Sequence, residues 1–223
     1  MRFPRGEAVF ENRYDAGRQL AVRLLEYEGQ GVIVLAIPNG GVPVALEIAS
    51  TLEADLDLIV CRKIPLPLAP EAGFGAIADD GTIILNEEVV KRIGLSRQQI
   101  EYEASKVRAE IKQRSILYKG DRPLVRVNDR AVIITDDGLA SGFTMMAAVE
   151  SVRHRRAKEI VVAVPVASAM AVKQLEKLAA KIVTCTTEFN PKFYVSDFYR
   201  AWHDLSDDEV VQYLRQWRMR RFG

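Results

Sequence analysis

The chain has 223 residues, which is enough for one large domain with a substantial core. It has 31 lysines and arginines against 30 aspartates and glutamates, so its net charge of +1 creates no overall field that would recruit nucleic acid or a membrane surface. The longest apolar run, Val32 to Ile37, is far too short to cross a bilayer. Met1 to Glu7 lacks the apolar centre of a signal peptide, and Cys61 and Cys185 lie in strand-like runs, which favours buried free thiols in a reducing cytoplasm.

The first part of the chain alternates between helical and strand-like patterns. A uniformly apolar run such as residues 32–37 is typical of a strand that is buried on both faces of a parallel sheet. A strand, a glycine-rich turn, a helix and a second strand predict a right-handed crossover in such a sheet. The expected elements are a helix over 15–28, a strand over 32–37, a turn at Pro38-Asn39-Gly40-Gly41, a helix over 42–52, and a strand over 56–61 that ends on Arg62 and Lys63.

The middle of the chain interrupts this alternation. Five prolines and glycines between Ile64 and Gly75 predict a loop, and Asp79-Asp80-Gly81 between two apolar runs predicts a hairpin. Helices are expected over 86–93 and 96–118, and Ser96 with Gln99 gives the second one a capping box. This second helix is so polar that we expect it to lie solvated over one edge of the core.

The alternation resumes after a polar connection over residues 120–129. The expected elements are strands over 132–135, 159–166 and 181–186, with helices over 145–155 and 170–180 between them. Residues 188–223 then carry a dense aromatic patch and a helix that starts at Ser206, where Glu209 completes a second capping box. These patterns predict an α/β core over residues 1–187, with an insertion at 64–118, and a C-terminal segment, 188–223, that is not an independent domain.

The stretch from Val132 to Thr144 carries the strongest functional signal. An apolar strand ends at the acidic pair Asp136 and Asp137, and a turn of small residues leads directly into a helix. This order places two carboxylates beside the free N–H groups and the positive dipole end of a helix, where anions bind. A ligand that carries both phosphate and sugar hydroxyls would suit such a rim, and so would a metal ion.

Two common nucleotide-binding motifs do not fit this chain. A P-loop needs a lysine after its second glycine, but Phe143 stands there and the loop is one residue short. Gly73, Gly75 and Ala78 have the spacing of a dinucleotide-binding fingerprint, but they precede a hairpin and not a helix.

The stretch resembles the signature that binds phosphoribosyl pyrophosphate (PRPP) in type I phosphoribosyltransferases. Gly40-Gly41 and Arg62-Lys63 match two further family sites in the expected order, each after a strand. The resemblance covers roughly residues 8–187, and the whole chain is most similar to the predicted bacterial and archaeal phosphoribosyltransferases of unassigned substrate. It implies an α/β fold with a mainly parallel sheet of about five strands flanked by helices, a hairpin and helix insertion, and a small C-terminal hood.

The resemblance implies a role for the residues of the acidic-pair stretch. Asp136 and Asp137 would accept hydrogen bonds from the ribose hydroxyls, as ionised carboxylates do well. They would also hold the cofactor Mg²⁺, mostly indirectly through PRPP or water, because this ion keeps much of its hydration shell. The 5′-phosphate would bind to the turn formed by Gly138, Leu139, Ala140, Ser141, Gly142, Phe143 and Thr144.

The pyrophosphate group would bind at the other two sites. Asn39, Gly40 and Gly41 would hold it through backbone N–H groups, often with a cis peptide in this family. Arg62 and Lys63 would neutralise it as it leaves, which makes them, together with the two acids, the candidate catalytic residues. Residues 64–85 occupy the place of the family's mobile loop, so we expect them to close over PRPP and to bring Glu71 and Asp79 or Asp80 near the site.

Two residues depart from the family pattern. Ala140 stands where purine-specific members carry an acid that handles the ring proton of the base, which argues against a hypoxanthine or guanine substrate. Asn39 stands where many relatives carry a basic residue, so the pyrophosphate site has one cation fewer.

The histidines and aromatic residues give weaker signals. His154 at a helix end and His203 beside Trp202 are expected to be structural. The aromatic patch is expected to seal the tail onto the core, but the base pocket of the family lies under the hood. One of four residues is therefore a candidate for stacking on the base: Phe193, Tyr194, Phe198 or Tyr199.

The implied activity is Mg²⁺-dependent transfer of the 5-phosphoribosyl group from PRPP to a nitrogenous base, with release of pyrophosphate, by a cytoplasmic, homodimeric pentosyltransferase of nucleotide and nucleoside metabolism. The acceptor is not identified by any residue. The main alternative is a PRPP-binding regulator without turnover, which Asn39 favours and the balanced charge disfavours. A third possibility is hydrolysis, with water as the acceptor in the same pocket.

Overall fold

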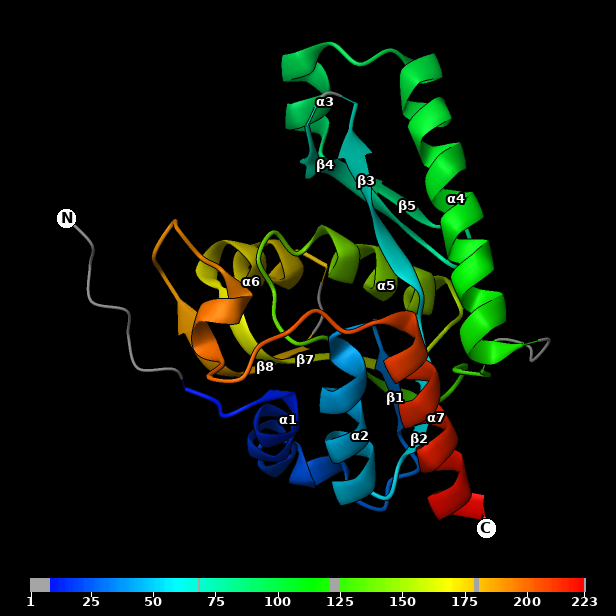
Figure 1. Ribbon diagram of the computed structural model, residues 1–223, viewed down its shortest axis with the longest axis vertical. Coiled ribbons are helices and arrows are strands. Elements are labelled where there is room, and N and C mark those ends of the chain that lie inside the picture. Colours follow the sequence, from blue (N-terminus) through cyan, green and yellow to red (C-terminus); the bar gives the residue numbers. More distant parts are fainter. Residues whose placement is uncertain (1–8, 68, 121–124, 179–180, 223) are drawn as a thin grey trace.

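A five-stranded parallel sheet forms the centre of the molecule, in the strand order β2-β1-β6-β7-β8 (Figure 1). This computed structural model describes residues 9–67, 69–120, 125–178 and 181–222, so the expectation about residues 1–7 lies outside it. The register pairs Ala36 with Thr135, so β1 and β6 end level with each other. The strands are β1 (Ile33–Ala36), β2 (Asp55–Leu58), β6 (Ala131–Thr135), β7 (Glu159–Ser168) and β8 (Lys181–Glu188).

Helices cover both faces of the sheet, which explains why β1, β6 and β7 are apolar and buried along almost their whole length. One apolar core lies under α1, α2 and α7, and a second lies under α5 and α6 on the opposite face. The expected α/β fold is confirmed. The helices of these layers are α1 (Arg13–Val22), which the short 3-10 turn η1 (Leu25–Tyr27) follows, α2 (Gly41–Thr51), α5 (Phe143–His154), α6 (Ala169–Glu176) and α7 (Asp207–Phe222).

An arm projects from one end of this core (Figure 1). It consists of the antiparallel sheet β3 (Cys61–Leu66), β4 (Ala69–Ala78) and β5 (Ile83–Leu85), with the helices α3 (Glu87–Ile93) and α4 (Arg97–Lys119). The expected hairpin is confirmed as the β4–β5 pair, and Ser96 and Gln99 form the expected capping box of α4.

Two expectations in this region are wrong. The expected strand over 56–61 ends at Leu58, and Arg62 and Lys63 lie inside the next strand, β3. The expected loop over 64–75 is mostly strand, because β3 and β4 pair from Cys61 and Ala78 onward. The register shifts around Pro65, and such an irregularity is where a strand tolerates a residue without an N–H donor.

The C-terminal segment packs along the core instead of forming a core of its own. Its first part contains the 3-10 turn η2 (Val195–Phe198), and Tyr199 packs there in a cluster with Phe10 from the N-terminal part of the chain. Val210 and Leu214 of α7 belong to the same apolar core as α1 and α2. Ser206 and Glu209 make the reciprocal bonds of the expected capping box. Among the described residues, no helix combines the length and apolar character needed to span a membrane.

Candidate active site

The acidic pair and the glycine turn meet at the carboxyl edge of the sheet, where neighbouring parallel strands β1 and β6 end. The N–H of Ile37 donates to the carbonyl of Thr135 at 2.9 Å, and this bond joins the chain that follows β1 to the end of β6. A Cβ atom on Gly40 would lie 1.9 Å from Oδ2 of Asp137, and one on Gly41 would lie 2.8 Å from the carbonyl of Thr135. Only glycine fits these two positions. The peptide between Pro38 and Asn39 is cis, as the family resemblance implies.

The turn that follows the acidic pair is anchored to β7. The N–H of Leu139 donates to the carbonyl of Val166 at 2.9 Å, and the carbonyl of Leu139 accepts from the N–H of Ser168 at 2.8 Å. The hydroxyl of Ser168 donates to the carbonyl of Ala140 at 2.6 Å. Leu139 belongs to the predicted phosphate-binding set, but its side chain is buried and both its backbone groups bond to β7. Its role in this structure is to fix the turn.

The N-terminus of α5 has the geometry of an anion site. Gly142 precedes the helix in the left-handed region, at φ +79°, and no side chain of the described residues caps the first turn. The first N–H groups of a helix have no partner within the helix, so they suit an anion. Ser141 is exposed, and Thr144 lines the neighbouring cavity.

This cavity, of about 510 Å³, brings the three predicted motifs together. Arg62 and Lys63 of β3 form one wall, Pro38 of the glycine turn another, and Asp136 and Thr144 a third. The side chain of Arg62 is 39% exposed, and its Nη2 atom lies 3.7 Å from Oε2 of Glu110 on α4. The cavity therefore has two basic side chains and the carboxylate of Asp136 in its lining, around a space that a small phosphorylated ligand would fit.

Burial dominates the electrostatics of the acidic pair. Desolvation and then the nearby charge of Asp137 raise the pKa of the Asp136 carboxyl well above its ordinary value. Desolvation also raises the pKa of Asp137, although the charge of Arg13 and its hydrogen bond oppose that rise. Both carboxylates are therefore poorly solvated, and a ligand that brings hydroxyl donors or a cation to them would stabilise their charged form.

Arg13 is a site residue that the sequence did not reveal. Its Nε atom donates to Oδ2 of Asp137 at 2.7 Å, and its Nη1 atom donates to the carbonyl of His203 at 2.9 Å. The guanidinium lies 3.8 Å from the ring centre of Trp202. A single arginine near the start of an amphipathic helix has no motif around it, so only the three-dimensional contacts identify it.

The aromatic patch serves mainly to pack the tail. Tyr199 is buried against Phe10 and Trp202, and its hydroxyl donates to the carbonyl of Asp137 at 2.6 Å. Desolvation raises the pKa of Tyr199, so this hydroxyl stays protonated as a donor. Phe193 stacks at an angle on Phe198, with ring centres 5.5 Å apart. Tyr194 is 65% exposed.

Asn39 binds both α4 and the start of α7. Its Nδ2 atom donates to the carbonyl of Leu205 at 2.8 Å and to Oδ1 of Asp207 at 2.9 Å. Its Oδ1 atom accepts from Nη1 of Arg114 at 3.1 Å and from the hydroxyl of Tyr118 at 2.9 Å. The residue that departs from the family pattern is thus the centre of a polar network, and spacing in the sequence gives no sign of its partners.

Several other predicted residues lie away from this cavity. Asp79 forms a buried ion pair with Lys119 at 2.9 Å and lines a separate cavity with Asp80. The side chain of Glu71 is outside the described part of the chain. His154 lies 3.2 Å from Glu150 at the end of α5, and the ring of His203 lies 3.0 Å from Glu209.

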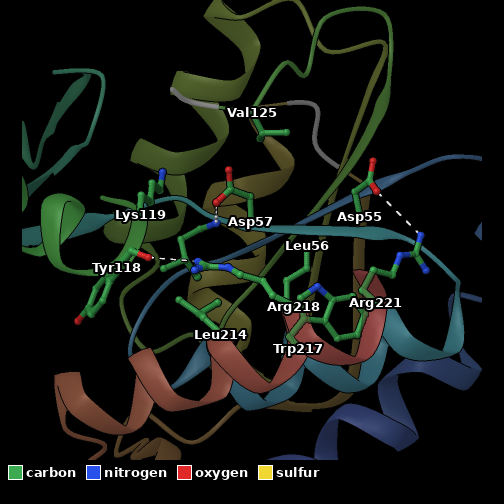
Figure 2. A pocket seen from close by; sticks show the side chains of 11 residues that line it. Asp55, Leu56, Asp57, Tyr118, Lys119, Val125, Leu214, Trp217, Arg218 and Arg221 are labelled. Atoms are coloured by element: carbon green, nitrogen blue, oxygen red, sulfur yellow. Dashed lines mark hydrogen bonds and ion pairs between the residues drawn. The ribbon is translucent and has the colours of Figure 1, made fainter. Parts of the chain in front are cut away.

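A second cavity, of about 340 Å³, lies at the outer edge of β2, and Figure 2 shows the side chains around it. Arg218 of α7 reaches along this cavity and donates to the carbonyl of Tyr118 at 3.3 Å. Arg221, one turn further on, donates to the carbonyl of Glu53 at 2.9 Å and lies beside Asp55. These contacts fasten the second half of α7 to the sheet edge and to the last turn of α4.

Within the described residues, no group of three or more histidine, cysteine, aspartate or glutamate side chains could enclose a metal ion. The acidic pair nevertheless suits a hard divalent cation, because Asp136 is a desolvated carboxylate on the wall of the cavity. Such an ion would need most of its ligands from water and from a bound anion.

Comparison with known proteins adds an independent finding. A family model described as the phosphoribosyl transferase domain matches residues 78–197, just over half of the chain. A protein of Mycobacterium tuberculosis (strain H37Rv), named "Putative phosphoribosyl transferase Rv0571c", is 39% identical over 206 residues. The match covers 92% of this chain and 46% of that protein, so the chain spans about half the length of the curated relatives it matches.

Two solved structures are also similar. The crystal structure of TT1426 from Thermus thermophilus has a TM-score of 0.77 and 33% identity, and the match covers 93% of this chain and 98% of that one. The structure of the AQ2163 protein from Aquifex aeolicus has a TM-score of 0.52, covers 84% of this chain and 85% of that one, and at 13% identity shares the fold alone.

Proposed function

This chain belongs to the phosphoribosyltransferase family, and from that premise we propose that it is an enzyme that transfers the 5-phosphoribosyl group of PRPP to a nitrogenous base, with Mg²⁺ as cofactor and pyrophosphate as the leaving group. The observation that supports this most strongly is the shared cavity. Its lining includes Asp136 of the acidic pair, Arg62 and Lys63 of β3, and Pro38 of the glycine turn, which come from three segments far apart in the sequence.

The geometry suggests how PRPP would lie. The 5′-phosphate would bind at the uncapped N-terminus of α5, with the hydroxyls of Ser141 and Thr144 beside it. The ribose hydroxyls would donate to Asp136 and Asp137, the desolvated carboxylates next to that turn. The pyrophosphate would then reach across the cavity to the glycine turn and to the side chains of Arg62 and Lys63.

Catalysis in this arrangement depends on position and charge. The bond between ribose C1 and the pyrophosphate oxygen breaks, and a bond from C1 to a ring nitrogen of the base forms. Arg62 and Lys63 would stabilise the negative charge that develops on the departing pyrophosphate. When bound, Mg²⁺ supplies further neutralisation of the pyrophosphate, and Asp136 and Asp137 would hold it largely through water and PRPP.

The acceptor would enter beside the first part of the C-terminal segment. Phe193 and Phe198 are half-buried and Tyr194 is exposed, so these rings remain the candidates for stacking on a base. Tyr199 is a weaker candidate, because its ring is packed and its hydroxyl holds the backbone of Asp137. Ala140 offers no acid to the base, which disfavours hypoxanthine and guanine. We further propose that the protein is a cytoplasmic homodimer that acts in nucleotide and nucleoside metabolism.

One experiment tests the proposed function. The protein is incubated with Mg²⁺, PRPP and each of a panel of nitrogenous bases, and pyrophosphate release is measured. We expect release that depends on one of the bases. Release without any base would indicate hydrolysis, and PRPP binding without release would indicate a regulator. If Mg-PRPP does not raise the melting temperature at all, PRPP binding itself is refuted.

Gly40→Ala provides a structural test of the same pocket. The backbone of Gly40 has φ −59°, which alanine adopts freely, but the new Cβ atom would collide with Oδ2 of Asp137. We expect PRPP binding to weaken by at least about tenfold, which corresponds to about 1.4 kcal/mol. The matched control is Gly94→Ala, which has nothing within 4 Å of the new Cβ atom but a φ of +68°. The control should lower stability by about 1 kcal/mol and leave PRPP binding unchanged; equal PRPP affinity in both variants would refute the assigned pocket.

A further inference from the structure

Arg114 lies beside the glycine turn although it comes from the inserted helix α4. Val107, Glu110 and Arg114 are spaced so that they share one face of that helix. Val107 and Glu110 line the cavity that contains Arg62 and Lys63. The next turn of the same face brings Nη1 of Arg114 to 3.1 Å from Oδ1 of Asn39. A guanidinium therefore lies next to Asn39, within the glycine turn.

The position of Arg114 matters because Asn39 leaves the predicted pyrophosphate site with one cation fewer. Asn39 carries no charge, whereas the family resemblance implies a basic side chain directly before the two glycines. A basic side chain from another segment of the chain can supply the positive charge beside the glycine turn. The side chain of Arg114 is one-quarter exposed, and its guanidinium contacts Asn39 and Asp207.

Two carboxylates accompany the arginines of this region. Arg62 lies 3.7 Å from Glu110, and Arg114 lies 3.3 Å from Asp207 at the first turn of α7. Partial burial opposes ionisation of Asp207, but hydrogen bonds from Tyr118 and Asn39 and then the charges of Arg114 and Arg62 outweigh it and lower its pKa. Both arginines thus act on the same carboxylate, so Arg114 and the cavity share one electrostatic environment.

We propose that Arg114 is a pyrophosphate-binding residue that replaces the cation absent at Asn39, and that Asp207 is the counter-ion that holds it in position until the anion binds. This inference rests on the proposed function and adds a residue to its pyrophosphate site. Bidentate contact between a guanidinium and phosphate oxygens is strong and directional, so a bound pyrophosphate competes well with one carboxylate. Tyr118 and Asn39 keep the side chain aligned during the exchange, because both contact its guanidinium.

The test measures binding of two separate probes to the whole protein by calorimetry: inorganic pyrophosphate with Mg²⁺, and ribose 5-phosphate. Arg114→Gln should weaken pyrophosphate binding by about tenfold or more and leave ribose 5-phosphate binding within about twofold of wild type. Arg108→Gln is the matched control, because Arg108 lies on the same helix and pairs with the exposed Glu101. It should bind both probes as the wild type does.

Asp207→Asn gives the opposite prediction. The amide can keep the hydrogen bonds to Asn39 and Tyr118, but the charge that competes for Arg114 is removed. We expect pyrophosphate to bind a few times more tightly to this variant than to the wild type. Weaker binding would show that Asp207 does not compete with the anion, and would overturn its assignment as the counter-ion.

The outcomes separate this inference from the proposed function. Wild-type pyrophosphate affinity in Arg114→Gln overturns the role of Arg114, and so does an equal loss of both probes, which would mean that Arg114 only supports the fold. In either case a wild-type protein that binds PRPP keeps its proposed function. If the wild type binds neither PRPP nor pyrophosphate, the proposed function fails and this inference fails with it.

Discussion

Asp137 is held from several directions by residues that are distant in the sequence. Arg13 donates to its carboxylate, and the hydroxyl of Tyr199 donates to its carbonyl. Gly40 leaves the space that the carboxylate occupies. Asp136 has a different environment, because its Oδ1 atom accepts from the N–H of Asp137 at 2.8 Å while burial opposes its ionisation. The two neighbouring acids therefore differ in how much of their charge the protein compensates.

This difference predicts the effect of pH on stability. Because the pKa of Asp136 is higher in the folded protein than in the unfolded chain, folding favours its protonated form. Its contribution to stability is present below the ordinary carboxyl pKa and is lost as pH rises through the raised pKa. Asp136→Asn removes this loss and keeps the acceptor for the N–H of Asp137. We expect the variant to melt at a higher temperature than the wild type at pH 8, by about 2–4 °C per kcal/mol recovered.

The measurement is the melting temperature of both proteins between pH 5 and pH 8, without ligand. The difference should be largest at the upper end and shrink as pH falls. Asp197→Asn, at an exposed acid of the C-terminal segment, serves as the control and should show a small and constant difference. A difference for Asp136→Asn that does not change with pH would contradict the assigned cause.

Among the elements, α4 links the arm to both the site and the C-terminal helix. Its Glu110 lines the cavity, and its Arg114 donates to Asn39 in the glycine turn. Its last turn is fixed at two points by α7, since Asp207 accepts from the hydroxyl of Tyr118 and Arg218 donates to the carbonyl of the same residue (Figure 2). The helix is therefore more than a solvated cover, although its polar sequence predicted only that.

The buried pair of Asp79 and Lys119 anchors the same end of α4 to the β4–β5 turn. Their side chains are 3% and 5% exposed, and Asp79 also accepts from the N–H of Val60 at 3.3 Å. Lys119→Met would leave a buried carboxylate without its cation, so we expect a loss of about 3–5 kcal/mol in the free energy of unfolding. Adding Asp79→Leu should recover much of that loss, because the uncompensated charge is removed as well.

Denaturant unfolding of the two single variants and the double variant measures this coupling. Lys112→Met is the control, since Lys112 is exposed two turns earlier on α4 and its replacement should change stability by less than about 0.5 kcal/mol. A double variant as unstable as the sum of the single variants would show that the pair does not interact.

Some elements of the fold and some residues of the site can be predicted from short stretches of the sequence, and others cannot. Alternating apolar runs and glycine turns predicted the parallel sheet, because each strand of such a sheet is apolar along its own length. The acidic pair, the glycine turn and the basic pair could be found because each follows a strand and is contiguous. Strand β3 could not be recognised, because Pro65 lies within it and further prolines and glycines follow it, a composition typical of a loop. Arg13 and Arg114 could not be recognised either, because their partners lie 124 and 75 residues away.

At the scale of the whole molecule, the cavity lies where the arm meets the core. Arg62 and Lys63 come from the arm, whereas Asp136 and Thr144 come from the core. A ligand that contacts both sides would hold them together, so closure over PRPP would involve the arm as a sheet and not a single loop. We therefore expect residues 64–85 to close as part of the arm's sheet.

Hydrogen exchange followed by mass spectrometry tests this prediction. Mg-PRPP should slow amide exchange in peptides from β3 and the adjoining part of β4 by about tenfold or more, because the bound pyrophosphate stabilises the strand that carries the basic pair. Exchange in α3, at the far end of the arm, is the internal control and should not change (Figure 1). Unchanged exchange in β3, in a protein whose melting temperature PRPP raises, would contradict closure of the arm.

Arg13 has a consequence for the protein during its synthesis. The sheet is complete once β8 has left the ribosome, at Glu188, but Trp202 and the carbonyl of His203 follow later. Until then a nascent chain has its strands and its acidic pair, but not the Trp202 ring and the His203 carbonyl that Arg13 contacts. The contacts of Arg13 with Trp202 and His203 therefore form only after the five-stranded sheet is complete, and the contact of Arg114 with Asp207 forms later still.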